Sequence, residues 1–196
     1  MTGAAGGGPA VPFPTSYWVV PGAFLAGGLP SAPTREGIES RMHALYNSGI
    51  RVIISLLERS ELGDGSGPVR PYEEAWLALG RAAGGTDGQA GGGPTEVVHF
   101  PVPDFGVPTG ERLREILAAI DGCLARRRPL YLHCWGGIGR TGTVVGAWLA
   151  QQGQATGEAV LRRLAELRAG LPDADRPSPE TAAQRRLVTT WPPRGG

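Results

Sequence analysis

The chain has 196 residues, with 19 basic and 18 acidic side chains and a formal net charge of +1. Every basic residue other than the three His is Arg, and no dense basic stripe occurs, which argues against nucleic acid or an anionic membrane as the main partner. The length fits one domain with a single active site, and the abundance of Gly, Ala, Pro and Arg indicates a GC-rich bacterial source.

Residues 1–14 are rich in Gly, Ala and Pro, so we expect a disordered N-terminal tail followed by one domain over residues 15–192. The tail lacks the apolar stretch of a signal peptide, and no later run approaches the ~20 apolar residues of a membrane span, so we expect a cytoplasmic protein. Two cysteines make no disulfide framework, and the three His are scattered, so we expect no metal site and no cofactor.

The first half of the chain contains predicted strands, a helix and polar loops. The stretch "YWVVPGAFLAGG" (17–28) predicts two short strands around a Pro-Gly turn. A helix is predicted from its N-cap at Thr34 to Gly49, and the apolar run 51–57 is typical of a strand buried on both faces. We expect a polar loop over 58–71, a short helix with Pro71 near its first turn, and a flexible loop over 84–94.

The second half alternates strands with helices. Residues 96–102 predict a strand, and 109–128 a helix whose apolar face includes Cys123 as a small buried hydrophobe. The strand 129–134 ends at Cys134, and helices are predicted over 140–153, 156–169 and 179–191. This order predicts an α/β fold with a central, largely parallel sheet of about four to five strands flanked by helices in three layers. Ligands bind beyond the carboxyl ends of such strands, where Cys134 lies.

The stretch "HCWGGIGRTG" (133–142) combines a cysteine, a glycine-rich loop and a helix start. Its glycines allow several N–H groups to converge on one centre, and the helix N-terminus adds a positive dipole, which together predict a cradle for a tetrahedral anion such as phosphate, sulfate or vanadate. The same field favours the thiolate of Cys134 as a nucleophile, while Arg140 offers a planar fork for two phosphate oxygens and Thr141 a hydroxyl for the sulfur. The loop residues are Trp135, Gly136, Gly137, Ile138 and Gly139.

A general acid is predicted in "PVPDFGVPTG" (101–110). Asp104 directly follows the strand 96–102, so it lies at the same sheet edge as Cys134 and could protonate a departing ester oxygen. The prolines exclude regular structure, and Gly106 provides a hinge. The alternative is a solvated loop aspartate without a role in catalysis, in which case the acid would be Asp64, Glu58 or Glu61 in the neighbouring loop.

The two stretches "HCWGGIGRTG" and "VPDFGVP" closely resemble the cysteine-dependent protein tyrosine and dual-specificity phosphatase superfamily, in particular the cyclin-dependent-kinase-associated phosphatase group. The resemblance implies that Cys134 is the nucleophile, Arg140 binds phosphate and the transition state, Asp104 acts as acid and then base, and Thr141 partners the thiolate. His133 would orient the nucleophile; as an isolated histidine it could equally be a satisfied core residue.

The chain also departs from the family pattern. Val102 stands where tyrosine-specific members have Trp. In "RPSPETAAQRRL" (176–187), Gln184 matches the second glutamine of a family segment, but Glu180 stands where tyrosine-specific members have the glutamine that orients the hydrolytic water. The water-orienting role therefore falls to Asp104 or to the cradle.

We therefore expect a monomeric, metal-independent enzyme that hydrolyses phosphotyrosine through a phosphocysteine intermediate, with phosphoserine and phosphothreonine as further substrates. Its partners would be phosphoproteins or small phosphomonoesters, without nucleic acid or membrane. One alternative is a phosphatase of phosphoinositides or inositol phosphates, which the absence of lysine from residues 135–139 disfavours. The others are a rhodanese-like sulfurtransferase, which needs no acid, and a non-catalytic phosphoprotein-binding module.

Overall fold

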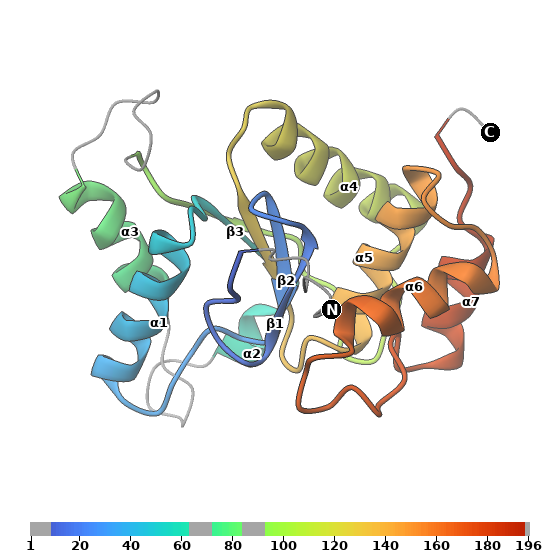
Figure 1. Cartoon of the computed structure of the whole chain (residues 1–196), viewed down its shortest axis with the longest axis horizontal. Coiled ribbons are helices and arrows are strands. Elements are labelled where there is room, and N and C mark those ends of the chain that lie inside the picture. Colours follow the sequence, from blue (N-terminus) through green and yellow to red (C-terminus); the bar gives the residue numbers. More distant parts are fainter. Residues whose placement is uncertain (1–8, 63–71, 84–92, 195–196) are drawn as a thin grey trace, which may run out of the picture.

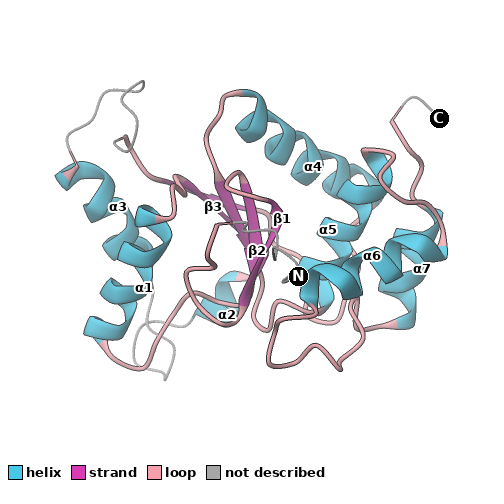
Figure 2. Ribbon diagram, viewed as in Figure 1, coloured by secondary structure: helices cyan, strands magenta, loops and turns pink. Residues whose placement is uncertain are grey.

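The computed structural model describes residues 9–62, 72–83 and 93–194 as a three-layer α/β fold. Figures 1 and 2 show the sheet in the middle, with α1 and α3 on one face and α4 to α7 on the other. The helices of the described part are α1 (Arg35–Asn47), α2 (Arg59–Leu62), α3 (Glu73–Ala82), α4 (Gly110–Ala125), α5 (Gly139–Gln151), α6 (Glu158–Arg168) and α7 (Ala182–Thr190). The predicted fold class is confirmed.

The sheet has five strands in the order β1-β2-β5-β3-β4. They are β1 (Ser16–Val20), β2 (Phe24–Gly27), β3 (Val52–Ser55), β4 (Glu96–His99) and β5 (Leu130–His133). Only the β1–β2 pair, joined by the predicted Pro-Gly turn, is antiparallel; β2, β5, β3 and β4 run parallel. The carboxyl ends of these four strands therefore meet at one edge, from which four separate loops emerge.

Alternating side chains of the strands supply two cores. Val52 and Ile54 face the core shared with α4 to α7, whereas Ile53, between them, faces the core shared with α1 and α3. Each of these three side chains is at most 1% exposed. The continuous apolar run in the sequence therefore reflects a strand that is covered on both faces.

Local signals explain where several helices begin. The Thr34 side chain accepts a hydrogen bond from the Gly37 N–H, as the predicted N-cap requires. Thr109 caps α4 in the same way, and Thr181 forms a capping box with Gln184 at the start of α7. These caps fix the points at which the chain leaves the loops near the sheet edge.

Two sequence expectations need correction. Phe13, assigned to the disordered tail, is only 8% exposed, because its ring packs edge-on against Tyr131 and its carbonyl accepts hydrogen bonds from Ser16. The polar loop after Glu58 begins with α2, which the sequence analysis missed because four residues carry no helical periodicity. The remainder of that loop at 63–71, including Pro71, lies outside the described residues, as do 84–92 and residues 1–8 of the predicted tail.

Candidate active site

The loop after β5 surrounds the Cys134 thiol with backbone. Its sulfur accepts a hydrogen bond from the Gly137 N–H at 3.3 Å, and the residue is 3% exposed. Gly137 has a φ of +75°, and a Cβ there would lie 2.5 Å from the Gly27 carbonyl carbon, so only glycine fits. The Leu29 N–H also binds the Trp135 carbonyl at 2.9 Å. The loop after β2 therefore supports the predicted cradle.

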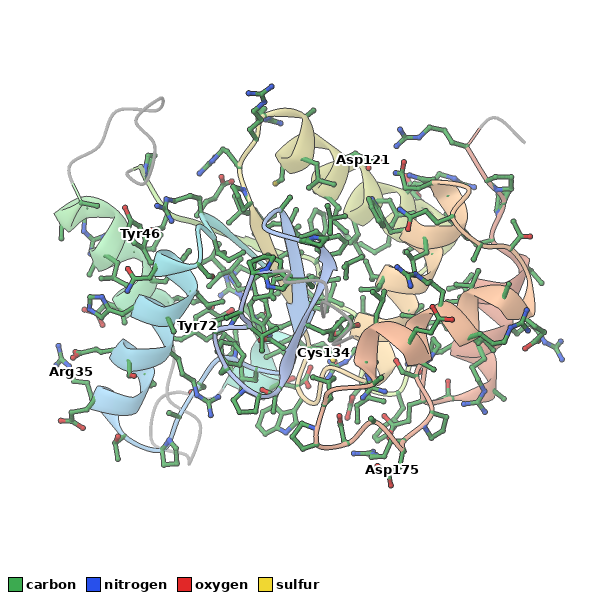
Figure 3. All side chains as sticks on the ribbon, viewed as in Figure 1. Arg35, Tyr46, Tyr72, Asp121, Cys134 and Asp175 are labelled. Atoms are coloured by element: carbon green, nitrogen blue, oxygen red, sulfur yellow. The ribbon has the colours of Figure 1, made fainter. Side chains whose placement is uncertain are left out.

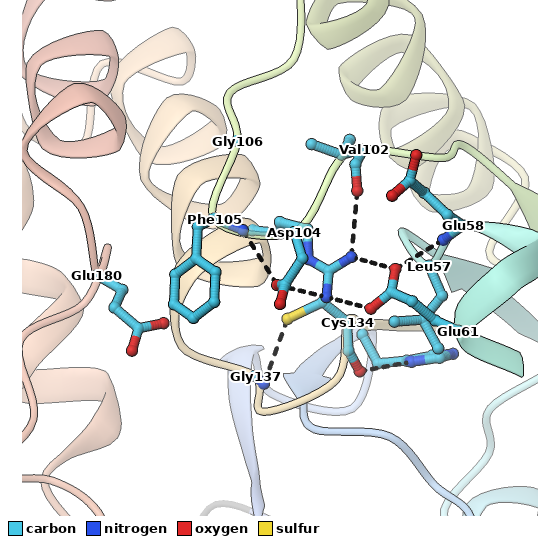
Figure 4. A network of polar contacts seen from close by, with 12 residues as sticks. Leu57, Glu58, Glu61, Val102, Asp104, Phe105, Gly106, Cys134, Gly137 and Glu180 are labelled. Atoms are coloured by element: carbon cyan, nitrogen blue, oxygen red, sulfur yellow. Dashed lines mark hydrogen bonds and ion pairs between the residues drawn. The ribbon is translucent and has the colours of Figure 1, made fainter. Parts of the chain in front are cut away.

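The Arg140 guanidinium is buried at the start of α5, with its side chain 2% exposed. Its polar partners are Glu61, Val102 and Asp104, which are labelled in Figure 4. Glu61 binds both terminal nitrogens, at 2.6 Å from Nη1 and 2.7 Å from Nη2. The Val102 carbonyl accepts from Nη1 at 3.1 Å, and Asp104 Oδ1 lies 2.9 Å from Nη2. Arg140 therefore joins the loops that follow β3, β4 and β5.

Burial and neighbouring charges shift the pKa values of Arg140 and Glu61 in opposite directions. Burial lowers the pKa of Arg140, but the hydrogen bond to Glu61 and the nearby negative charges raise it more, so its pKa lies above its ordinary value. Burial likewise raises the pKa of Glu61, yet its hydrogen bonds with Arg140 and the Glu58 N–H bring that pKa below its ordinary value. Both groups are thus ionised at neutral pH, and Glu61 fixes the orientation of the fork.

Asp104 lies in a tight turn on the loop after β4. The Gly106 N–H donates to the Pro103 carbonyl at 2.9 Å, and Asp104 Oδ1 accepts from the Phe105 N–H at 3.1 Å. Phe105 has a φ of 55°, unusual for a residue with a side chain, and is 60% exposed. The structure thus brings Asp104, which is 55% exposed, to the edge where Cys134 and Arg140 lie.

His133 is fully buried directly before Cys134. Its Nδ1 lies 3.0 Å from the Cys134 carbonyl and its Nε2 lies 2.6 Å from the Tyr72 hydroxyl. Because a carbonyl only accepts, Nδ1 carries the hydrogen and Nε2 accepts from Tyr72. Burial lowers the pKa of His133 to about 4, so the ring is neutral at pH 7. Figure 3 shows Tyr72 and Cys134 toward the same end of the sheet.

The Thr141 hydroxyl has a different hydrogen-bond partner from the one that the family resemblance implies. The hydroxyl, fully buried, donates to the Gly27 carbonyl at 3.3 Å rather than to the Cys134 sulfur. A hydroxyl has one hydrogen, and the backbone of β2 approaches closely enough to accept it. This hydrogen bond links α5 to β2.

The segment between α6 and α7 borders the same loop. Ser178 donates to the Ile138 carbonyl at 2.8 Å, and Glu180 pairs with Arg176 at 2.6 Å. Gln184 is fully buried, and its amide donates to the Gly106 carbonyl at 2.9 Å. The structure therefore brings both residues of the "RPSPETAAQRRL" match to this edge, Gln184 in direct contact with the Asp104 loop.

The sequence indicated Glu61 only as an alternative acid, and it predicted neither the ion pair of Glu61 with Arg140 nor the contact of Tyr72 with His133. Neither Glu61 nor Tyr72 belongs to a sequence motif, and their partners are 79 and 61 residues away along the chain. For Glu61 the available signal was its position just after the carboxyl end of a buried strand. Within the described residues, no group of three or more His, Cys, Asp or Glu could hold a metal ion, and no helix is long and apolar enough to cross a membrane.

Short stretches of the sequence are similar to curated proteins. A stretch of 43 residues is 40% identical to cyclin-dependent kinase inhibitor 3 of Sus scrofa, covering 22% of this chain and 20% of the relative. The first relatives that it matches are thus covered over only a fifth to about a third of their own length.

Two solved structures are similar over most of the chain. Kinase associated phosphatase with its catalytic cysteine changed to serine superposes with a TM-score of 0.64 at 20% identity, covering 84% of this chain and 83% of that one. PTPMT1 in complex with PI(5)P superposes with a TM-score of 0.61 at 18% identity, covering 90% and 94%. At these identities the likeness concerns the fold.

The family is shown by a sequence model described as "Polymorphic toxin system, DSP-PTPase phosphatase", which matches residues 28–154. That range contains the cysteine loop, Arg140, Asp104 and Glu61, whereas Glu180 and Gln184 lie beyond it. The chain, with its cysteine loop at the carboxyl edge of a largely parallel sheet, belongs to this family of DSP-PTPase phosphatases.

Proposed function

We propose that the protein hydrolyses phosphomonoesters through a phosphocysteine intermediate, with phosphotyrosine as its preferred substrate in proteins and phosphoserine and phosphothreonine as further substrates. One observation carries the proposal: the Cys134 sulfur accepts the Gly137 N–H at 3.3 Å in a loop that leads directly into Arg140. A thiolate there is stabilised by this N–H and by the N-terminus of α5.

In the first step the Cys134 thiolate attacks phosphorus, the S–P bond forms, and the ester P–O bond breaks. The departing oxygen takes the proton of Asp104. In the second step a water attacks phosphorus, Asp104 takes up a water proton, and the S–P bond breaks to return the thiolate and release inorganic phosphate. Atoms and charge balance without a metal or a cofactor.

Arg140 would hold the phosphoryl oxygens in both steps. Glu61 uses one hydrogen of each terminal nitrogen, and the Val102 carbonyl uses the other hydrogen of Nη1. The phosphate then replaces Asp104 at Nη2, where the two side chains are 2.9 Å apart. This exchange frees Asp104 to take up a proton from solvent, which it then donates to the departing ester oxygen.

The surroundings of the thiol favour an aromatic monoester over a polyphosphorylated headgroup. Phe105 and Trp135 flank Asp104 and Cys134 in sequence and are 60% and 48% exposed, so their rings can contact an aryl group. Residues 135–139 contain no cation that could bind a second phosphate. PTPMT1 crystallised with PI(5)P, so phosphoinositides are the rival substrate to be tested.

The test combines intermediate trapping with a substrate panel. Rapid acid quenching during turnover of p-nitrophenyl phosphate should yield phosphocysteine at Cys134 by peptide mass spectrometry. Cys134→Ser should abolish turnover, while the matched control Cys123→Ser, on α4, should retain it. The proposal is wrong if Cys134→Ser retains turnover. Preferred hydrolysis of phosphoinositides over phosphotyrosine peptides, or sulfur transfer from thiosulfate, would establish one of the alternatives.

A further inference from the structure

The side-chain amide of Gln184 bridges two elements that are separate in sequence. Its Oε1 accepts from the backbone N–H groups of Glu180, at 3.1 Å, and Thr181, at 3.0 Å. These two donors require an acceptor, so Nε2 must face the other way, where it donates to the Gly106 carbonyl at 2.9 Å. One buried amide therefore caps α7 and binds the loop that carries Asp104.

Gly106 is the point at which this loop turns back. Its N–H closes the turn on Pro103, and Asp104 lies between these two residues in the chain. On the near side of the turn, Arg140 binds the Val102 carbonyl at 3.1 Å. The loop is thus held before the turn by Arg140 and at its end by Gln184.

The amide of Gln184 also packs against the start of α5. A Cβ placed on Gly139 would lie 3.1 Å from its Oε1 and 3.2 Å from its Nε2. Gly139 is the last residue of the cysteine loop, directly before Arg140. Gln184 therefore fixes the Asp104 loop relative to the cysteine loop, and both face the same thiol.

We propose that Gln184 is a positioning residue for proton transfer: its NH2 group holds the Asp104 loop at the distance from Cys134 at which Asp104 reaches the ester oxygen. The inference rests on the proposed function. Gln184 itself touches neither substrate nor sulfur in this scheme; it acts through Gly106 and Asp104.

The side-chain chemistry offers a variant that separates this role from the capping of α7. In Gln184→Glu a carboxylate still accepts from the Glu180 and Thr181 N–H groups, as a glutamate in a capping box does. The second oxygen then faces the Gly106 carbonyl without a hydrogen to donate, so the loop loses its attachment.

We expect kcat of Gln184→Glu to fall about tenfold on phenyl phosphate and on phosphotyrosine peptides, whose leaving groups need a proton, and less than about twofold on p-nitrophenyl phosphate. The rate of Cys134 alkylation by iodoacetamide should stay at the wild-type value, because the sulfur and Gly137 are unaffected. A merely structural role would change neither the leaving-group dependence nor its pH profile.

Two matched controls complete the design. Thr181→Ala removes the hydroxyl that accepts the Gln184 N–H at 3.2 Å, so it should lower the melting temperature and keep the wild-type leaving-group dependence. Gln154→Glu adds the same charge at an exposed position after α5 and should behave like the wild type. If Gln184→Glu does not fold, Gln184→Met serves instead; it loses the cap and the loop contact and should show both defects.

Equal losses on all leaving groups in the Gln184 variants, or wild-type kinetics in either, would overturn the inference while wild-type turnover and phosphocysteine trapping still supported the proposed function. A wild-type protein that hydrolyses no aryl phosphate would instead refute the proposed function, and the role of Gln184 with it.

Discussion

Two arginines of this protein are equally buried but differ in the partners that neutralise them. The side chains of Arg140 and Arg168 are each 2% exposed, and each pairs with a carboxylate. Arg168 binds Asp173 and the Arg176 carbonyl, both at 3.0 Å and both within the eight residues that follow it. Its Nε has no hydrogen-bond partner among the described residues.

Arg140, by contrast, takes its partners from loops that are far apart in the chain. Glu61 and the Val102 carbonyl are largely enclosed, but Asp104 is 55% exposed and sits on a turn. An exposed carboxylate can give way to phosphate, whereas the partners of Arg168 shape the segment that leads to α7. Burial and pairing with a carboxylate are therefore common to both arginines, and what distinguishes Arg140 is its exposed partner at the sheet edge.

The largest effect is expected when the guanidinium group of each arginine is replaced. Arg140→Lys keeps the charge but loses the planar fork, so we expect kcat/KM for p-nitrophenyl phosphate to fall about 10³-fold. Arg168→Lys should lower the free energy of unfolding by roughly 1–3 kcal/mol and leave kcat/KM within about tenfold of the wild type. Steady-state kinetics and urea unfolding of both variants measure the contrast, and equal kinetic losses would remove it.

The second effect concerns the exchangeable carboxylate. Asp104→Asn should lower kcat about 10²-fold on phosphotyrosine, whose phenolate leaves with a pKa near ~10, and less on activated aryl phosphates. It should also tighten phosphate binding, because the amide competes less for Arg140. Asp173→Asn, the corresponding change at Arg168, is the control and should alter stability alone. A loss at Asp104→Asn that is the same for every leaving group would exclude it as the acid.

The third effect concerns the pH dependence of stability, because His133 is a buried titratable group near the same site. His133 has a pKa of about 4 in the folded protein, whereas the unfolded chain binds that proton near pH ~6.5. Stability is therefore complete above pH ~6.5 and falls as the pH drops toward 4, by about 3 kcal/mol from this group. Urea unfolding between pH 7 and 4 should show a smaller decline in His133→Gln.

The control for that measurement is His43→Gln, because His43 is exposed on α1. It should lose stability with falling pH as the wild type does. If both variants follow the wild-type curve, the burial of His133 does not set the acid sensitivity.

Much of the fold followed from the sequence because its signals are local. The apolar runs at β3 and β5, the Pro-Gly turn and the Thr34 cap each depend on neighbouring residues, and all four were found. Sequence also placed Cys134, Arg140 and Asp104 at one edge, because parallel strands end together.

The interactions around those residues could not be predicted in the same way. Glu61 reaches Arg140 from a four-residue helix without periodicity, and Tyr72 reaches His133 from a position 61 residues earlier in the chain. The motif predicted that the Thr141 hydroxyl would bind the sulfur. It contained no information about the Gly27 carbonyl, which lies 114 residues earlier in the chain and accepts the hydroxyl hydrogen instead. The burial of Phe13 was not predicted, because glycine and proline dominate the composition of the surrounding segment.

The smallest expected effect tests whether Glu61 acts through Arg140 or on the substrate. Glu61→Gln replaces one of the two oxygens by an NH2 group that cannot accept from Arg140, so the fork is oriented less firmly. We expect kcat/KM to fall about tenfold. The loss should be the same for substrates with different leaving groups, because Asp104 still donates the proton.

Stability adds a second readout for this variant. Because Arg140 lowers the pKa of Glu61, the pair stabilises the fold above the ordinary glutamate pKa of ~4.3, and this contribution is lost as the pH falls through the folded-state value. The difference in unfolding free energy between the wild type and Glu61→Gln should therefore shrink below pH ~4. Glu58→Gln, at the adjoining end of α2, is the control and should match the wild type. A Glu61→Gln loss that grows with leaving-group pKa would instead make Glu61 the acid, and Asp104 would then resemble Asp173 as a carboxylate that only neutralises its arginine.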